Sequence, residues 1–558
     1  MIDIRNIQEL EERLQQLVNK PINSVEELEG WIQEEGQIDK EIKQQIGKCY
    51  IDFHCYSDNE EIKKAYQFSQ QKATPLVKKY KAQLDEKFYN NPFKSDLNQE
   101  LYGSYIKSKL NSIELFKEEN IKLEAEEDAL ISKYSSIMGN MTVMWEGEEK
   151  TLLQMSVYLM GSDRSIREKA WRLVQERRLE DSKDLDEIMD QMVKIRHQIA
   201  INAGFSNYRD YMFKKYERFD YTPEECKTFH QAVEKTIVPI KDGLERELQQ
   251  KLGVDTLRPW DSNATPQGTK AISLLETSKD MVEVTIKMFY SVKKEYGDLL
   301  RKMQEEGMLD LDSRKAKANG GFCYYLPVKE LSFIFMNFSG SYHGFVTMVH
   351  EMGHSIHNLL KKNLPIYHYH TTPMESSELA SMSMELITMD KWNCLYPDKE
   401  DFKKLRIDHL ENIIKFVSWA MTVDKFQHWI YENPNHTAKE RNMMFKEIAK
   451  SLSQHYEDWS GLQEELENRW KAQIHMYEVP FYYIEYAIAQ LGALQVWKNY
   501  CENPQKALAD FESALALGRS KPLTEVYEAA GIKFDFSEEL IGELMDFIKG
   551  KLEAIKNQ

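Results

Sequence analysis

The sequence predicts a mainly α-helical protein that also contains a small β-sheet. Glycine and proline are scarce, at 24 and 15 of 558 residues, and long runs of Glu, Lys, Leu, Gln and Met favour helix. Apolar residues in these runs recur every three or four positions, which is the period of an amphipathic helix. A chain of this length can bury a large core, and we expect more than one lobe.

The helical period begins near the start of the chain. Ile7, Leu10, Leu14 and Leu17 set the spacing, and nearly continuous amphipathic helix is expected as far as about residue 135. Residues 142–153 show a different pattern, in which two short β-prone runs flank a glycine-containing turn. This pattern predicts a hairpin.

Helix is expected again over residues 164–252, followed by a turn-rich stretch at 253–268 and further helix over 271–306. Aromatic and β-branched residues then dominate Leu331–Phe338, which is the best strand candidate in the chain. After Gly344 the pattern predicts helices and connecting loops.

Composition excludes several classes of function. The formal net charge of −18 argues against nucleic-acid binding, which needs clustered Lys and Arg. No apolar run approaches the roughly 18 residues of a membrane span, and no signal peptide is visible. The six cysteines lack CxxC pairing, so we expect reduced thiols and a cytoplasmic protein. The sequence leaves the oligomeric state open.

The sharpest chemical pattern is His350-Glu-Met-Gly-His354, which flanking apolar residues place on an amphipathic helix. Histidines four residues apart lie one turn above each other, so both imidazoles can bind one metal ion. Glu351 lies close enough to act as a base on a water molecule beside that ion. Gly353 costs about 1 kcal/mol in a helix interior, which indicates that another segment passes close to the backbone there. We interpret the pattern as a catalytic zinc site; the alternative is two structural histidines.

A catalytic zinc ion needs a third protein ligand and an open position. His357 shares the helix face, but it lies seven residues from His350, about 10 Å along the axis, which is too far for one ion to bind both together with His354. The third ligand is therefore expected on the next helix.

That helix has a marked start, with Thr372 as expected N-cap, Pro373 in the first turn and Glu375 closing a capping box. Glu375 then has a structural role, which leaves Glu378 as the best third ligand, at the border of the buried stripe. Glu385 lies on the same line and is expected to orient an imidazole.

At these residues the sequence resembles the M3 family of zinc peptidases, in particular its oligoendopeptidase F branch. The zinc helix matches the family's HExGHxxH pattern, and residues 377–385 resemble its second-helix motif, whose first glutamate, here Glu378, is the third zinc ligand. Residues 335–340, 320–323 and 142–153 resemble the strand and turn before the zinc helix, a glycine-rich loop and a hairpin. The resemblance extends from about residue 110 to the end of the chain.

This resemblance implies a two-lobed helical body, like that of thimet oligopeptidase and neurolysin, with one zinc ion per chain in a deep substrate channel. It implies an N-terminal helical lobe or lid over residues 1–110 and a catalytic region over residues 111–558. By similarity, His475, Tyr483 and Tyr486 are expected to donate hydrogen bonds to the substrate and the oxyanion. Tyr477 and Tyr482 remain alternatives for this role.

The expected function is zinc-dependent hydrolysis of internal peptide bonds in short oligopeptides, with Glu351 as the base. The strand Leu331–Phe338 is expected to present an edge on which an extended peptide pairs. The alternatives are a carboxypeptidase-type zinc exopeptidase of the same class and a non-catalytic peptide-binding helical protein.

Overall fold

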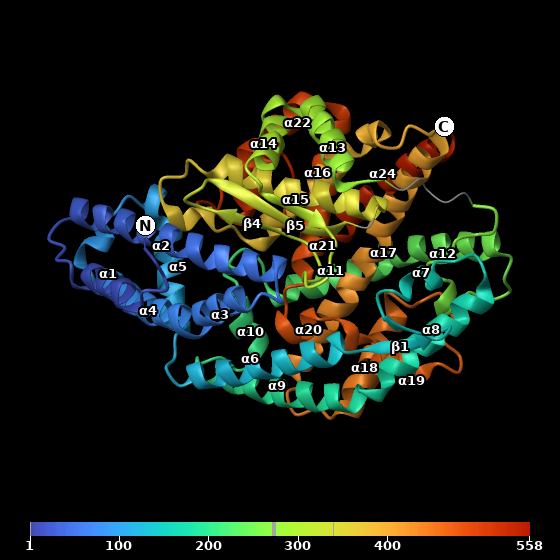
Figure 1. Cartoon of the computed structure of the whole chain (residues 1–558), viewed down its shortest axis with the longest axis horizontal. Helices are drawn as coiled ribbons and strands as arrows, with labels where there is room; N and C mark the ends of the chain where they lie inside the picture. The colour runs from blue at the N-terminus through green and yellow to red at the C-terminus, as the bar shows by residue number, and fades with distance from the viewer. Residues whose placement is uncertain (1, 270–274, 339) are drawn as a thin grey trace.

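The computed structural model describes residues 2–269, 275–338 and 340–558, and most of these residues lie in helices (Figure 1). The expected mainly α-helical fold with small sheets is confirmed. The first helices are α1 (Ile7–Asn19), α2 (Val25–Cys55), α3 (Glu60–Phe68), α4 (Thr74–Asn90), α5 (Gln99–Leu115), α6 (Asn120–Gly139), α7 (Ser156–Leu159), α8 (Arg164–Glu180), α9 (Ser182–Asn202), α10 (Tyr208–Lys215), α11 (Pro223–Thr236) and α12 (Val238–Leu252). The later helices are α13 (Ser278–Val292), α14 (Lys294–Glu305), α15 (Tyr342–Lys361), α16 (Met374–Thr388), α17 (Lys399–Glu432), α18 (Ala438–Ser451), α19 (Gln463–Asn468), α20 (His475–Glu478), α21 (Ile484–Glu502), α22 (Pro504–Leu515), α23 (Leu523–Ala529) and α24 (Glu538–Lys556).

Helices α1, α2, α4 and α5 pack around a hydrophobic core of their own, at the left of Figure 1. Trp31 is fully buried in this core, and its indole N–H donates to the carbonyl of Leu17 at 3.0 Å. The core also takes in Ile366 and Tyr369, from the segment between α15 and α16. The Tyr369 hydroxyl donates to the carbonyl of Leu101 at 2.6 Å. The N-terminal helices are thus anchored to the chain beside α15.

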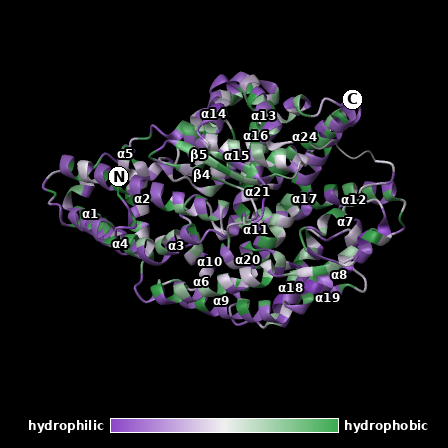
Figure 2. Ribbon diagram, viewed as in Figure 1, coloured by the Kyte–Doolittle hydropathy of each residue, from purple (hydrophilic) through white to green (hydrophobic). Residues whose placement is uncertain are grey.

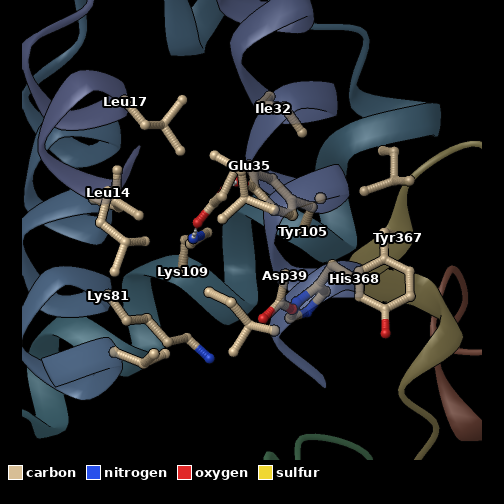
Figure 3. Close-up of a pocket in the computed structure, with 16 residues that line it drawn as sticks. Leu14, Leu17, Ile32, Glu35, Asp39, Lys81, Tyr105, Lys109, Tyr367 and His368 are labelled. Atoms are coloured by element: carbon tan, nitrogen blue, oxygen red, sulfur yellow. Dashed lines mark hydrogen bonds and ion pairs between the residues drawn. The ribbon is translucent and has the colours of Figure 1, made fainter. Parts of the chain in front are cut away.

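A cavity of about 70 Å³ lies among these helices (Figure 3). Leu14, Leu17 and Ile32 line it with apolar groups. On its polar side, Lys109 lies 2.6 Å from Glu35 and, away from the cavity, 2.5 Å from Asp85. These ion pairs compensate the charge of the buried ammonium group. Because its lining comes from the N-terminal helices and residues 366–368, the cavity is an interior space between them.

The predicted hairpin is confirmed. Strands β1 (Thr142–Trp145) and β2 (Glu148–Thr151) pair antiparallel. Both turn residues, Glu146 and Gly147, have positive φ, at 52° and 87°, as a type I′ hairpin turn requires.

The second sheet contains β3 (Leu309–Asp312), β4 (Phe322–Leu326) and β5 (Leu331–Phe338), in the order β3-β5-β4. Strand β5 is parallel to β3 and antiparallel to β4. The strand prediction for Leu331–Phe338 is confirmed, but its predicted role as an edge is wrong, because partners occupy both sides of β5. The edges of this sheet are β3 and β4.

The helix expected over residues 271–306 is interrupted. Residues 271–274 lie outside the described part of the chain, and α13 starts at Ser278 with the Thr277 side chain as its cap. Lys293 adopts an extended conformation and separates α13 from α14.

Helices α15, α16 and α21 form the centre of the large core (Figure 1). Helix α15 packs against β4 and β5, α16 packs on α15, and α21 packs on α16. Figure 2 shows hydrophobic residues concentrated in the strands and central helices, whereas the outer helices alternate hydrophobic and hydrophilic faces. In the described part of the chain, no helix combines the length and the apolar character needed to cross a membrane.

Candidate active site

Helix α15 presents His350, Glu351 and His354. It follows directly on β5, and the Ser341 side chain caps it by accepting a hydrogen bond from the Gly344 backbone N–H at 3.4 Å. Its opposite face is fully buried through Phe345, Val349, Met352 and Ile356. The sheet and the core together fix the direction in which the two imidazoles point.

Gly353 explains how α15 and α16 come so close. A Cβ atom at this position would lie 2.4 Å from the Cα of Ser381 and 2.8 Å from the carbonyl oxygen of Ala380. Backbone atoms cannot move aside as a flexible side chain can. The prediction that another segment passes close to Gly353 is confirmed, and that segment is α16.

We expect Gly353→Ala to destabilise the protein despite the higher helix propensity of alanine. Overpacking against α16 lowers the free energy of unfolding by about 1–3 kcal/mol or more. This loss exceeds the gain of about 1 kcal/mol from removing a helical glycine. Thermal unfolding measures this effect. Gly243→Ala in α12 is the matched control, since its Cβ would have nothing within 4 Å, and this variant should gain stability. Equal stability of Gly353→Ala and the wild type would contradict the close approach.

The start of α16 differs from the prediction. The N-cap position is Pro373, no side chain caps the helix, and Met374 is its first residue. Glu375 is buried and accepts a hydrogen bond from the Tyr221 hydroxyl at 2.7 Å. The capping box was therefore wrong, because long-range contacts with Tyr221 and Arg218 compete for the Glu375 carboxylate. Glu375 nevertheless has a structural role.

The structure brings the ligand atoms of His350, His354 and Glu378 within 4.8 Å of one another. The Oε2 atom of Glu378 lies 3.3 Å from His350 Nε2 and 3.9 Å from His354 Nε2. The two imidazole rings are 4.9 Å apart and nearly perpendicular. The Glu378 side chain is 5% exposed, while those of His350 and His354 keep 22% and 17%. The cluster is thus closed on the α16 side and open beside the histidines.

The electrostatics of the cluster depend on which group carries the proton. Burial opposes a charge on His350, but hydrogen bonds to Glu378 and Glu385 outweigh it and raise the pKa of His350 well above its usual value. Burial lowers the pKa of His354 to about 4. Burial also opposes the charge of Glu378, yet the hydrogen bond from His350 gives a net lowering of its pKa. A cation that binds here competes with the proton shared by His350 and Glu378.

Glu351 is buried beside this cluster and belongs to no ion pair with it. Burial raises its pKa to about 7, which suits a group that must accept and release a proton near neutral pH. Gly321, just before β4, lies against it: a Cβ atom there would be 3.8 Å from Glu351 Oε1 and 3.3 Å from the carbonyl oxygen of Phe335. A side chain at this position would crowd the Phe335 carbonyl, so the glycine lets the backbone before β4 lie close to Glu351.

Glu385 holds His350, and His409 in turn contacts Glu385. Glu385 Oε1 lies 2.7 Å from His350 Nδ1, as predicted for a group that orients an imidazole. His409 of α17 lies 3.6 Å from the other oxygen of Glu385. His357 points elsewhere: it is buried, and burial lowers its pKa well below the usual value.

The aromatic segment that runs from α20 to the start of α21 divides into a core part and a part near the site. Tyr477 is fully buried and stacks on Tyr134, with ring centroids 3.9 Å apart, so it is a core residue. Tyr482 and Tyr486 are half-buried, and burial followed by the negative charge of Glu378 raises the pKa of both. Tyr483 is buried beside His475, with ring centroids 4.9 Å apart.

The backbone of this segment is strained at one residue. Phe481 has φ at 66°, a conformation that is costly for a bulky residue. Its N–H donates to Gln427 Oε1 at 2.7 Å, and its carbonyl accepts from Arg218. These contacts hold the backbone just before Tyr482, whose hydroxyl, like that of Tyr486, lies within electrostatic reach of Glu378 on α16.

Sequence reasoning missed the residues that orient His475. Gln473 Nε2 lies 2.7 Å from His475 Nδ1, and the Trp419 indole donates to Gln473 Oε1 at 3.0 Å. Trp419 and His409 both come from α17. No local motif marks them, since their contacts join residues far apart in the chain.

Comparison with known proteins agrees with this geometry. The model of peptidase family M3 matches residues 157–546, and the model of the peptidase M3 N-terminal domain matches residues 3–116. An oligoendopeptidase F homolog from Borreliella burgdorferi is 24% identical over 453 residues, which cover 79% of this chain and 75% of the relative.

Solved structures extend the likeness to the whole chain. The structure of PZ peptidase A with inhibitor 2 superimposes with a TM-score of 0.91 and 29% identity, covering 99% of this chain and 98% of that one. Oligoendopeptidase-F from Enterococcus faecium shares the fold, with a TM-score of 0.68, 16% identity and coverage of 99% and 98%. The chain therefore belongs to peptidase family M3 and is a metalloendopeptidase of the oligoendopeptidase F branch.

Proposed function

We propose that one zinc ion binds to His350, His354 and Glu378, and that the enzyme hydrolyses internal bonds of short oligopeptides. One observation carries this proposal: both Nε2 atoms face Glu378, while each Nδ1 atom has another partner. Those partners are Glu385 at 2.7 Å and Ser377 Oγ at 3.3 Å. Two imidazole nitrogens and one carboxylate suit zinc, with ligand distances of about 2 Å and a fourth position left for substrate or water.

When bound, zinc acts as a Lewis acid that polarises the scissile carbonyl and lowers the pKa of water. Glu351 has no other partner in the cluster, so its carboxylate is available to take the proton of the attacking water. It then delivers this proton to the leaving amine. The pKa near 7 that burial imposes on Glu351 allows both transfers, and a nearby cation shifts that pKa downward.

Hydrogen-bond donors for the developing oxyanion are expected from the aromatic segment. Of the tyrosines predicted from the sequence, Tyr486 is half-buried and within electrostatic reach of Glu378, whereas Tyr483 is buried and its pKa responds to burial and to Trp419 instead. We therefore propose Tyr486 as the oxyanion donor, with His475 binding the substrate beside it. Tyr482 shares the position of Tyr486 next to Glu378 and is the alternative donor.

We expect Tyr486→Phe to lower kcat by about 10²–10³-fold with little change in KM, since an oxyanion donor acts in the transition state. Tyr477→Phe is the matched control, because its hydroxyl lies in the core at 3.5 Å from the Leu185 carbonyl. Steady-state kinetics of both variants, with Tyr482→Phe beside them, measure the effect. Full turnover by Tyr486→Phe would remove it from the mechanism.

Glu385 offers a test of zinc binding that leaves every ligand in place. Glu385→Gln should weaken zinc binding by about 10–100-fold, as expected when the partner of a metal-bound histidine is lost. Competition with a chelator of known affinity measures the change. An unchanged zinc affinity would show that the contact with His350 Nδ1 does not support binding.

The substrate is proposed to pair with β4 instead of β5. Strand β4 is an edge of its sheet and begins next to Gly321, which lies against Glu351. Backbone pairing with an edge strand ignores side-chain identity, which suits a broad range of peptides.

Peptides that are blocked at both ends test the substrate class. We expect them to be cleaved internally, and casein-sized proteins to be cleaved far more slowly, because a deep channel admits only short extended chains. Cleavage of free-ended peptides alone would establish an exopeptidase, and comparable rates on casein would contradict the channel.

We also propose a cytoplasmic location, in line with the expectation of reduced cysteines.

A further inference from the structure

A second cluster of metal-ligating residues lies between α11 and α17. Cys226 and His230 are four residues apart on α11, and Asp424 and His428 are four residues apart on α17. Each pair therefore projects from one face of its helix, one turn apart. All four residues are buried.

The side chains of Cys226, Asp424 and His428 face one another, and His230 contacts Asp424. The ligand atoms of Cys226, Asp424 and His428 lie within 4.8 Å of one another. His230 Nε2 lies 2.7 Å from Asp424 Oδ2, and His428 Nε2 lies 3.3 Å from the same oxygen. The rings of His230 and His428 are 5.6 Å apart and nearly perpendicular.

Several polar atoms of this cluster have no hydrogen-bond partner among the described residues. They are Asp424 Oδ1 and both ring nitrogens of His428, and all are buried. His428 Nε2 is close to Asp424 Oδ2 without the geometry of a hydrogen bond. Buried polar atoms are almost always paired or bound to a metal ion. These free atoms all belong to side chains that ligate metals.

We propose that Cys226, Asp424 and His428 bind a second zinc ion, with His230 holding the Asp424 carboxylate in place. Sulfur, nitrogen and oxygen ligands together suit zinc among the common divalent ions. On binding, the Cys226 thiol releases its proton to solvent, and the thiolate and the carboxylate then balance the two positive charges of the ion. His230 contacts the carboxylate from outside, as partners of metal ligands commonly do.

This site is separate from the candidate active site and does not depend on the proposed function. Along α17, Asp424 lies about 22 Å beyond His409, the residue that contacts Glu385. The second ion is therefore structural: it joins α11 to the helix that also supports the active site through His409 and Trp419.

Zinc content tests the proposal. After incubation with zinc and removal of the excess, the wild type should contain two zinc ions per chain by elemental analysis. Cys226→Ser and Glu378→Gln should each contain one, and the double variant should contain none. Cys323→Ser, which replaces a partly buried thiol packed against the same large core, should retain two and is the control. An unchanged zinc content in Cys226→Ser, or a Glu378→Gln variant without zinc, would overturn the proposal, whereas one zinc in the wild type that Cys226→Ser loses would count against the active-site zinc alone.

Cobalt gives a second readout that does not depend on the folding of the Cys226 variant. Saturated with cobalt, Glu378→Gln should show thiolate-to-cobalt charge-transfer absorption, because the second site is the one metal-binding cluster among the described residues that includes a sulfur ligand. Absence of this absorption in Glu378→Gln and in the wild type would also overturn the proposal.

Discussion

Replacing Glu351 by Gln should lower kcat by about 10²–10⁴-fold, the range that a positioned general base contributes. The amide has nearly the same shape as the carboxylate but cannot accept the proton of the attacking water. Glu351 forms no ion pair with His350, His354 or Glu378, so zinc content should stay at the wild-type value. Steady-state kinetics on an internally quenched peptide, together with elemental analysis, measure both quantities.

Glu351→Asp serves as the graded control for this variant. It keeps the carboxylate but moves it back by one methylene group, so it should retain more activity than Glu351→Gln. If Glu351→Gln retained wild-type kcat with zinc bound, another residue would have to be the base.

Glu378→Gln should have the second large effect, through loss of the metal. A neutral amide replaces the one anionic ligand of the cluster, and zinc affinity should fall by more than the roughly 100-fold that follows loss of a partner to a ligand. Activity at limiting zinc should fall with it. Titration with zinc against a competing chelator measures the affinity.

The matched control is Glu375→Gln, on the same helix and three residues earlier. Glu375 is also buried, but it contacts Tyr221 and Arg218 instead of the histidines. This variant should lose stability and keep its zinc affinity. Wild-type zinc affinity in Glu378→Gln would exclude Glu378 as a ligand and leave the third ligand to be found elsewhere.

The sequence predicted those parts of the site that local geometry determines. His350 and His354 were placed together because residues four apart share a helix face, and Gly353 indicated the close approach of α16. The family and the fold followed from the same motifs. The roles of Glu351, His475, Tyr483 and Tyr486, and the division at residue 110, remain predictions.

Where contacts join distant segments, the sequence was less informative. The capping box at Glu375 was wrong because Tyr221 and Arg218 bind its carboxylate, and no local pattern reports partners so far away. Strand β5 was expected at an edge, since its own residues do not show that β3 and β4 pair on both sides. The same reason explains why His409 and Trp419 were missed.

The central claim is that a zinc ion at His350, His354 and Glu378 catalyses cleavage of internal peptide bonds. Its most direct test is the cleavage of a quenched-fluorescent peptide blocked at both ends, before chelation, after chelation and after zinc is restored. We expect activity to disappear on chelation and to return on addition of zinc to the wild type, while Glu351→Gln stays inactive throughout. Activity that survives complete removal of zinc, or that zinc restores equally in Glu378→Gln, would contradict the account.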